Sequence, residues 1–597
     1  MKIIISTCLL CCLAFFVNAQ SIVTFVLETP PAGTYAGVGI RGSQAPLSWE
    51  KTTPLEVIDG KLSAQLTFPE AEVPLEFKFV YEDAKGKVNW EYLENRRLSL
   101  TGGALTYVAS WDVEPLIDLA TLPPFTVSAL QKDYLIIEEA IRLHPGLYRY
   151  LTEEELTAQL AKLKAKFSQP LSVGEAYLVL SALTASIRCG HTGSPFFNQG
   201  AVVNSVIHRQ ADKLPFTFRW REERMLVVED GTPEALFPLG TEILALNGVP
   251  VASILRELRQ YVASDGPSVD PVDGILSLRG YPFRYDAFDV FYPLAFPFAG
   301  SSLGVSYRQP DGSLANATIT TVTREVRTET LQHRYPEFPV ATDDLWGLEI
   351  VDEETAILTV GDFSGEGAGA LTLDPATFFA KAFADLKAKN IQNLILDVRE
   401  NEGGNDPIVA ELFTYCPFKS RKEADFEGRM RYAEFPESLK PIVKSWGEDP
   451  WYYRPKTDGY DADKGAYIIA DEFANNYKNK VKKNAFRGRV CVLTGRINAS
   501  LGFYLAKAVQ DYQIGTLIGE TTGGSLRGIN GGQLLFIRLP NTNIELDLPV
   551  LGGFATTPQP VHGVVPAVPV TITAADQLAG QDVVLAAALS FLSEQKK

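Results

Sequence analysis

A serine at position 500 stands where a buried strand gives way to a helix. Residues 488–494 are mostly apolar and typical of a strand, and residues 501–510 have the pattern of a helix. A hydroxyl at such a turn lies at the helix N-terminus, where free backbone N–H groups can stabilise an oxyanion. The arrangement predicts that Ser500 is a nucleophile and that the N–H of Leu501 is one oxyanion donor.

A second strand ends in a glycine turn. Residues 391–397 form an apolar run that leads through a polar segment into Gly403 and Gly404. Open α/β sheets place their chemistry at such strand ends. Glycine lets a substrate carbonyl approach a backbone N–H closely. We therefore expect one of the two glycines to provide the second oxyanion donor. The residues expected to brace the turn are Asp397, Arg399 and Asn401.

Three segments, taken together, resemble a known peptidase family. They are the Asp-x-Arg-x-Asn-x-Gly-Gly turn at 397–404, the Ala-Ser turn at 499–500 and the Gly-Glu-Thr-Thr-Gly-Gly loop at 519–524. In order and spacing they resemble the core of the tail-specific (C-terminal processing) and tricorn-type serine peptidases. The resemblance covers residues ~130–595. It implies a crotonase-like α/β catalytic core and hydrolysis of peptide bonds.

A serine hydroxyl needs an adjacent base to act as a nucleophile at neutral pH. The tail-specific branch uses a lysine in the 519–524 loop region, but that position holds Ser525 here. The tricorn-type branch uses a histidine ahead of a PDZ-like part, and residues 189–192 (Cys-Gly-His-Thr) resemble that motif. The resemblance implies His191 as the general base. His562 is the alternative base, whereas His144 fits a structural role at a helix end.

The chain departs from the tricorn-type pattern at three positions. Gly190 replaces a serine, Pro560 replaces a glutamate and Ala567 replaces an aspartate. The residue that orients the general base is therefore unassigned: Glu520 is one candidate, Glu545 is a weaker one, and a backbone carbonyl is a third. The departures leave a second function open, that of a non-catalytic glycan- or peptide-binding surface protein on a peptidase scaffold.

The segment 20–112 carries a pattern of its own. Its short alternating strands and turns predict an all-β sandwich. It resembles a starch-binding carbohydrate module, in which tryptophans stack on glucose rings and polar side chains bond the hydroxyl groups. The alternative is that both tryptophans belong to the core of a small sandwich. The substrate-binding positions that match by residue type are Trp49, Lys78, Trp90, Glu91 and Asn95.

The chain is expected to be multidomain. The turn Asn247–Gly248, followed by a helical run, resembles the end of a PDZ-like module that binds carboxylates. A long aromatic-rich insertion lines or covers the active site, or else is peripheral. The predicted boundaries are 1–19 for a signal peptide, 20–112 for the β-sandwich, 128–198 for a helical domain that carries His191, 200–330 for a PDZ-like domain with connecting strands, and 345–597 for the α/β peptidase core with its insertion at 416–487.

Composition limits the partners. The net charge is −17 and no Lys/Arg-rich run is present, so nucleic acid is not expected as a partner. The N-terminus predicts a cleaved signal peptide and export, to the periplasm, the outer surface or the medium. It consists of Lys2, the apolar run 3–17 and a small-residue site at 17–19. No later run is long enough for a transmembrane span. No metal-ligand spacing or phosphate loop is visible, so no cofactor or metal is expected. A protein or peptide is the expected substrate, with a starch-like glucan as a second candidate ligand.

Overall fold

The computed structural model divides into two compact units, residues 1–117 and 118–597. The predicted signal peptide lies outside the described residues. The structure describes residues 20–31, 35–58, 60–69, 75–83, 85–91, 95–98, 100, 103–111, 122–196, 199–364, 371–418, 426–445, 457–469 and 480–594.

The described part of the first unit consists of two sheets that share one hydrophobic cluster. The strand orders are β4-β5-β1-β9 and β3-β2-β6-β7, with β8 paired to β6. Buried and exposed side chains alternate along β1 and β6, as expected where one face of a strand covers a core. Phe25, Phe77 and Phe79 lie in the cluster. The strands are β1 (Gln20–Thr29), β2 (Gly37–Gly42), β3 (Thr53–Pro54), β4 (Glu56–Ile58), β5 (Lys61–Pro69), β6 (Leu75–Glu82), β7 (Val88–Trp90), β8 (Arg96–Leu98) and β9 (Gly103–Ser110).

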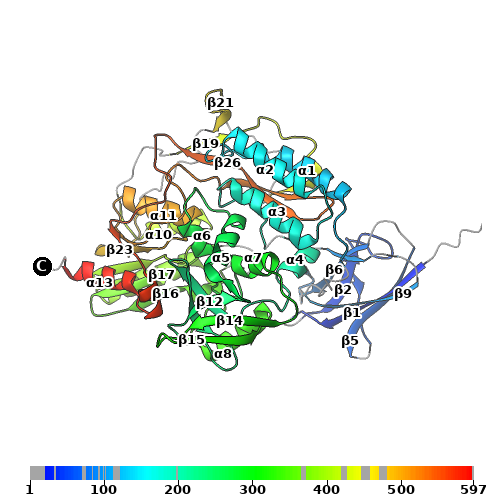
Figure 1. The fold of residues 1–597 in the computed structure, drawn as a ribbon, viewed down its shortest axis with the longest axis horizontal. Coiled ribbons are helices and arrows are strands. Elements are labelled where there is room, and N and C mark those ends of the chain that lie inside the picture. The colour runs from blue at the N-terminus through cyan, green and yellow to red at the C-terminus, as the bar shows by residue number, and fades with distance from the viewer. Residues whose placement is uncertain are drawn as a thin grey trace, which may run out of the picture. The chain divides into compact units, whose positions relative to one another are not determined.

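The second unit begins with three helices that pack side by side (Figure 1). They are α1 (Val127–Ile141), α2 (Glu153–Lys166) and α3 (Val173–Ser186). Capping boxes start α2 and α3, in which a hydroxyl and a glutamate three residues later bond each other's backbone N–H. The loop after α3 carries His191.

An antiparallel sheet follows, in the order β10-β11-β12-β14-β15, with β13 paired to β12. Helices from the same stretch of chain, α5 and α6 among them, pack against this sheet (Figure 1). The elements are α4 (Ala201–Ile207), β10 (Phe216–Arg221), β11 (Arg224–Asp230), β12 (Glu242–Leu246), β13 (Val249–Pro250), α5 (Val251–Leu258), η2 (Arg259–Tyr261), α6 (Asp270–Ile275), α7 (Ala287–Ala295), β14 (Ser302–Arg308), β15 (Leu314–Thr320), α8 (Arg324–Arg334) and η3 (Thr342–Leu345).

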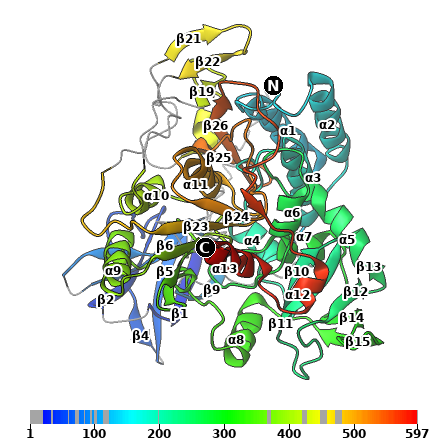
Figure 2. The same cartoon turned by 90° about the vertical axis from the view of Figure 1, so that its left-hand side faces the viewer.

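The α/β core is built on the sheet β16-β17-β18-β23-β24-β27. All its pairs are parallel except that of β16 with β17. Parallel strands need cover on both faces, and Figure 2 shows α11 and α13 on opposite sides of β23. The elements are β16 (Trp346–Ile350), β17 (Thr355–Val360), α9 (Pro375–Ala388), β18 (Asn393–Asp397), α10 (Asp406–Phe413), β23 (Arg489–Thr494), α11 (Ser500–Asp511), β24 (Thr516–Gly519), β27 (Val568–Pro569), α12 (Ala574–Leu578) and α13 (Val583–Glu594).

A further sheet, in the order β20-β25-β26-β19-β22-β21, joins the core to the helical part. An isolated bridge pairs Gly193 with Asp547 of β26, and so ties the loop after α3 to this sheet. The described strands of the 416–487 insertion extend the sheet, and its aromatic residues at 446 and 451–453 lie outside the described residues. The elements are β19 (Phe426–Met430), η4 (Lys440–Ile442), β20 (Val443–Lys444), β21 (Thr457–Asp461), β22 (Ala466–Ile469), β25 (Gly532–Arg538) and β26 (Glu545–Ala555).

The predicted strands and helices around the candidate site are confirmed in type. The strand expected at 391–397 is β18, the one expected at 488–494 is β23, and the helix expected at 501–510 is α11. Within the described residues, no helix combines the length and apolar character that crossing a membrane requires.

A buried ion pair between α7 and α8 is expected to stabilise the second unit. The Oδ2 of Asp289 lies 2.6 Å from the Nη2 of Arg327, and the two side chains are 2% and 0% exposed. Asp289→Ala leaves the guanidinium buried without its carboxylate partner, which should lower the free energy of unfolding by about 3–5 kcal/mol in urea denaturation. The exposed partner of Lys440, Glu437, provides the matched control, because Glu437→Ala should cost at most about 1 kcal/mol. Equal effects of the two substitutions would contradict this interpretation.

Candidate active site

Ser500 lies in a sharp turn between β23, which ends at Thr494, and α11, which begins at Ser500 itself. Its backbone φ is +48°, in the left-handed region that few non-glycine residues adopt. Such strain costs about 1–3 kcal/mol and is found where the surrounding structure holds a functional residue in place. The turn presents the hydroxyl at the amino end of the helix.

His191 lies within hydrogen-bond distance of this serine. Its Nε2 is 3.0 Å from the Ser500 Oγ, although 309 positions separate the two residues in sequence. The ring packs closely on Gly531, where a Cβ would lie 3.0 Å from Cε1 and Nε2. Burial lowers the pKa of His191, and the Asp265 carboxylate partly offsets this by raising it. A neutral imidazole in this position can accept the proton of the hydroxyl.

Asp265 is the carboxylate beside the histidine. Its Oδ1 accepts a 3.0 Å hydrogen bond from the N–H of Gly190. One donor atom from each of Cys189, His191 and Asp265 lies within 4.8 Å of the other two. The Oδ2 of Asp265 and the Nδ1 of His191 are buried, and the described residues provide neither with a hydrogen-bond partner. Because buried polar atoms are usually paired, these two suit each other as acceptor and donor.

Asp265 could be inferred from the sequence only indirectly. A Cβ at Gly190 would lie 3.2 Å from the Oδ2 of Asp265, a distance that requires the carboxylate to move. The serine of the tricorn-type pattern would therefore crowd Asp265, and its replacement by glycine makes room. Asp265 follows Gly190 by 75 positions. No local motif marks it, so the departure at Gly190 was the available signal.

The glycine turn packs directly against the serine. A Cβ on Gly403 would lie 2.8 Å from the Ser500 Cβ and 3.0 Å from the Leu501 nitrogen. The N–H of Gly403 donates to the Oδ1 of Asn401 at 2.9 Å, which removes it as an oxyanion donor. Of the two glycines expected to offer the second donor, this leaves Gly404, and the candidacy of Gly403 is corrected. Within the described residues, no acceptor engages the N–H of Gly404 or of Leu501.

Buried amides hold the two turns together. Asn401 donates from Nδ2 to the carbonyl of Val360 at 3.0 Å, and Asn498 donates to the carbonyl of Asn401 at 2.8 Å. Both asparagines are fully buried. Arg399 pairs with Asp397 at 2.6 Å. The predicted bracing role of these three turn residues is confirmed.

The carboxylates predicted to orient the histidine lie elsewhere. Glu520 forms an ion pair with Arg221 at 2.5 Å, and Glu545 forms one with Arg538 at 2.5 Å. Each carboxylate already has a guanidinium partner, so neither is available to the imidazole. The structure places Asp265 beside His191, whereas Glu520 pairs with Arg221, so the prediction that Glu520 orients the histidine is corrected.

The other predicted histidines have separate surroundings. The Nδ1 of His562 is 2.8 Å from the carbonyl of Gly563. His144 is fully buried, and burial lowers its pKa to about 3, which suits a structural residue. Ser525, at the lysine position of the tail-specific branch, accepts a 2.7 Å hydrogen bond from the hydroxyl of Tyr150. The structure therefore brings only His191 to the serine among the histidines of the described residues.

Two tryptophans of the predicted glucan site lie together in the first unit. The ring centroids of Trp49 and Trp90 are 6.1 Å apart, and Trp90 is 38% exposed. The guanidinium of Arg41 lies 5.1 Å from the Trp90 ring centroid. Asn95 is exposed and donates to Glu76 at 3.2 Å. Trp49 is half-buried.

The two remaining residues of that prediction are engaged within the unit. Lys78 donates from Nζ to the carbonyl of Glu91 at 3.1 Å. The side chain of Glu91 is buried, where it pairs with Arg96 at 2.5 Å and accepts the N–H of Phe79 at 2.9 Å. Glu91 therefore stabilises the interior, and the prediction that it bonds sugar hydroxyl groups is corrected.

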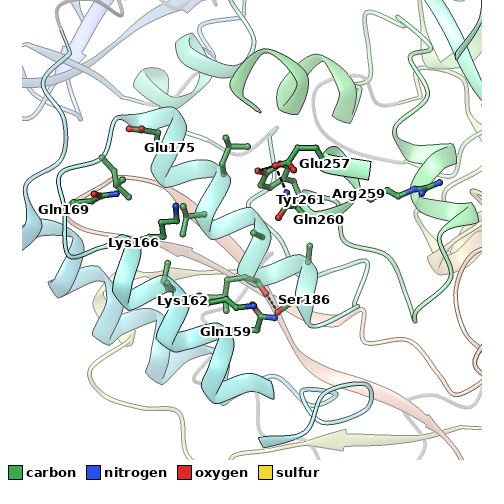
Figure 3. A pocket seen from close by; sticks show the side chains of 17 residues that line it. Gln159, Lys162, Lys166, Gln169, Glu175, Ser186, Glu257, Arg259, Gln260 and Tyr261 are labelled. Carbon is green, nitrogen blue, oxygen red and sulfur yellow. Dashed lines mark hydrogen bonds between the residues drawn. The ribbon is translucent and has the colours of Figure 1, made fainter. Parts of the chain in front are cut away.

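Two cavities of the second unit lie apart from the serine. One, of about 770 Å³, is lined by α2, α3, residue 257 and residues 259–261 (Figure 3). The other has a volume of about 310 Å³. Neither has Ser500 or His191 in its wall. The charged residues that line the smaller cavity are Arg219, Arg221, Arg279, Arg399, Arg496, Asp397, Glu400 and Glu520.

The chain is similar to known peptidases. Residues 354–535 match the family model described as Peptidase family S41. The structure of mature CPAF complexed with lactacystin is similar over 79% of this chain and 97% of that chain, at 16% identity and a TM-score of 0.54. Another structure of mature CPAF covers 75% of this chain and 94% of that chain, at 16% identity and a TM-score of 0.52. No curated protein matches the chain.

These findings support a serine peptidase with an S41-type core in a multidomain, mixed α/β chain. Ser500 and Gly404 lie within the matched segment 354–535, whereas His191 and Asp265 lie outside it.

The Asn401 network yields a prediction about the glycine turn. Asn401→Ala leaves the carbonyl of Val360 and the N–H of Gly403 buried without their partner, which should lower the free energy of unfolding by about 1–3 kcal/mol. Hydrogen exchange measured by mass spectrometry should rise in residues 398–405. The exposed side chain of Asn405, which caps no helix N–H, makes Asn405→Ala the control. The interpretation fails if both variants exchange like the wild type.

Proposed function

We propose that this protein is an exported serine endopeptidase in which Ser500 is the nucleophile and His191 the general base. The observation that carries the proposal is the 3.0 Å separation of the Ser500 Oγ and the His191 Nε2. The non-catalytic alternative predicts that these two side chains are too far apart to bond, so the distance argues against it. The strained turn at Ser500 adds support, because such strain is typical of functional sites.

The proposed reaction follows the serine peptidase scheme. His191 accepts the hydroxyl proton of Ser500 as the oxygen attacks the scissile carbonyl, and the N–H groups of Leu501 and Gly404 stabilise the oxyanion. The imidazolium then protonates the leaving amine, which departs and leaves an acyl group on Ser500. Water attacks the acyl group while His191 accepts its proton, and the same proton returns to Ser500 as the acid product leaves.

We assign Asp265 as the positioning residue of this base. Its Oδ2 would accept the Nδ1–H of His191, which fixes the tautomer whose Nε2 is free to take a proton. The carboxylate would also stabilise the imidazolium that forms during the reaction. Gly190 supports this role because its N–H holds the other carboxylate oxygen at 3.0 Å.

Cleavage of casein by the mature chain tests the peptidase. Ser500→Ala and His191→Ala should each lower the rate roughly 10³-fold or more, because each removes a member of the reacting unit. His562→Ala should cleave at nearly the wild-type rate. Cleavage by Ser500→Ala at the wild-type rate would contradict the proposal. So would a wild type that cleaves neither casein nor short peptides.

Asp265→Asn should lower kcat roughly 10²-fold or more while KM changes little, because the substitution disturbs the base and not the substrate site. Steady-state kinetics on a fluorogenic peptide measure both parameters. Glu520→Gln is the control, because Glu520 pairs with Arg221 and should leave kcat nearly unchanged. A rise in KM alone in Asp265→Asn, or equal losses of kcat in both variants, would argue for a structural role.

We also propose that the first unit is a β-sandwich that binds a starch-like glucan and localises the peptidase near it. The two sheets around one hydrophobic cluster support the sandwich. The adjacent indoles of Trp49 and Trp90 support the glucan surface, since flat sugar faces stack on exposed aromatic rings.

Trp90→Ala should weaken binding of a linear maltooligosaccharide at least about tenfold, because an exposed aromatic anchor is lost. Isothermal titration calorimetry measures the affinity. Val57→Ala, at a side chain 73% exposed on β4, is the control and should bind like the wild type. Unchanged affinity in Trp90→Ala would refute the glucan site.

The finer organisation of the second unit is part of the proposal. Residues 200–330 are assigned as a PDZ-like module that receives an extended peptide. The turn at Asn247 and Gly248, with φ values of +48° and +77°, supports this, as does the helix α5 that follows it. Asn247 fixes the turn by accepting the N–H of Gly304 at 2.8 Å.

A further inference from the structure

Three side chains, that of His191 among them, have the donor atoms that Zn²⁺ prefers. Cys189 offers a thiolate, His191 an imidazole nitrogen and Asp265 a carboxylate oxygen, and one such atom from each lies within 4.8 Å of the other two. Bonds of about 2.0–2.3 Å in a tetrahedral zinc site leave ligand atoms about 3.3–3.8 Å apart. Small side-chain rotations would therefore close the set around an ion.

His191 and Asp265 each have a buried polar atom that lacks a partner in the described structure. The Nδ1 of His191 and the Oδ2 of Asp265 are buried without a hydrogen bond, and Asp265 is only 5% exposed. The third donor, the thiol of Cys189, is 1% exposed and lies 3.6 Å from the carbonyl of Asn530. The N–H of Gly190 already holds the Oδ1 of Asp265, which orients the free oxygen.

We propose that Cys189, His191 and Asp265 form an inhibitory Zn²⁺ site that switches the serine off reversibly. Inhibition of peptide cleavage by the ion rests on the proposed function, whereas binding of the ion does not. The three protein ligands leave a fourth position for water.

The proposed inhibition follows from the two nitrogens of one imidazole. A metal on Nδ1 of neutral His191 obliges the ring proton to sit on Nε2, the atom that faces Ser500. Nε2–H can then only donate to the hydroxyl and cannot accept its proton. Binding converts the thiol of Cys189 to a thiolate and moves the ring proton from Nδ1 to Nε2, so one proton is released for each Zn²⁺ bound.

Metal binding is tested first, without reference to activity. The chelator-treated mature chain is titrated with Co²⁺, which should give one equivalent of thiolate-to-cobalt charge-transfer absorption. Cys189→Ala should lose the absorption. Cys416→Ala, at a buried free cysteine in another hydrophobic cluster, is the matched control and should retain it. Thermal melts of both variants establish that they fold.

Inhibition is tested next by cleavage of a peptide at increasing Zn²⁺. Without metal, Cys189→Ala should cleave at nearly the wild-type rate. It should need at least about tenfold more Zn²⁺ for half inhibition, and a chelator should restore wild-type cleavage.

Cobalt absorption that is absent in the wild type, or kept in Cys189→Ala, would overturn the metal site. An inhibition constant unchanged in Cys189→Ala would overturn the switch. If the wild type shows the absorption but cleaves nothing, the proposed function fails while the metal site stands.

Discussion

The contact between the His191 Nε2 and the Ser500 Oγ is the interaction that the rest of the second unit must maintain. The two atoms lie 3.0 Å apart, and they come from segments separated by 309 positions. Helix α3 leads to the histidine, the β23–α11 turn presents the serine, and the bridge of Gly193 to β26 ties the histidine loop to the neighbouring sheet. Gly531 lets its backbone reach the imidazole, because a Cβ there would crowd the ring.

The departure from the tricorn-type pattern at Gly190 is consistent with the position of Asp265. A serine before the histidine would place its side chain close to the carboxylate, and Gly190 instead offers an N–H to it. In the proposed account, Asp265 orients the base from a different segment of the chain. A thiol, an imidazole and a carboxylate lie close together at this point of the structure. In the proposed account, the residue that supports the base is therefore also a residue through which a metal could stop it.

The local pattern of the sequence was sufficient for the strands and turns that carry Ser500 and Gly404. An apolar strand followed by a glycine turn or by a helix start leaves a clear trace, and β18, β23 and α11 lie where they were expected. Long-range pairing leaves no such trace. Whether a carboxylate such as Glu520 faces an imidazole or a guanidinium depends on packing between distant segments, as its pairing with Arg221 illustrates. Glu91 was misjudged for a similar reason, because burial beside Arg96 is decided by the fold of the whole unit.

Covalent trapping of the nucleophile tests the central claim most directly. The mature chain would be treated with an alkyl fluorophosphonate, and the adduct would be mapped by mass spectrometry of its peptides. The account predicts one adduct, on Ser500, formed roughly 10³-fold more slowly in His191→Ala and at the wild-type rate in His562→Ala. An adduct on another residue, or undiminished labelling of Ser500 in His191→Ala, would contradict it.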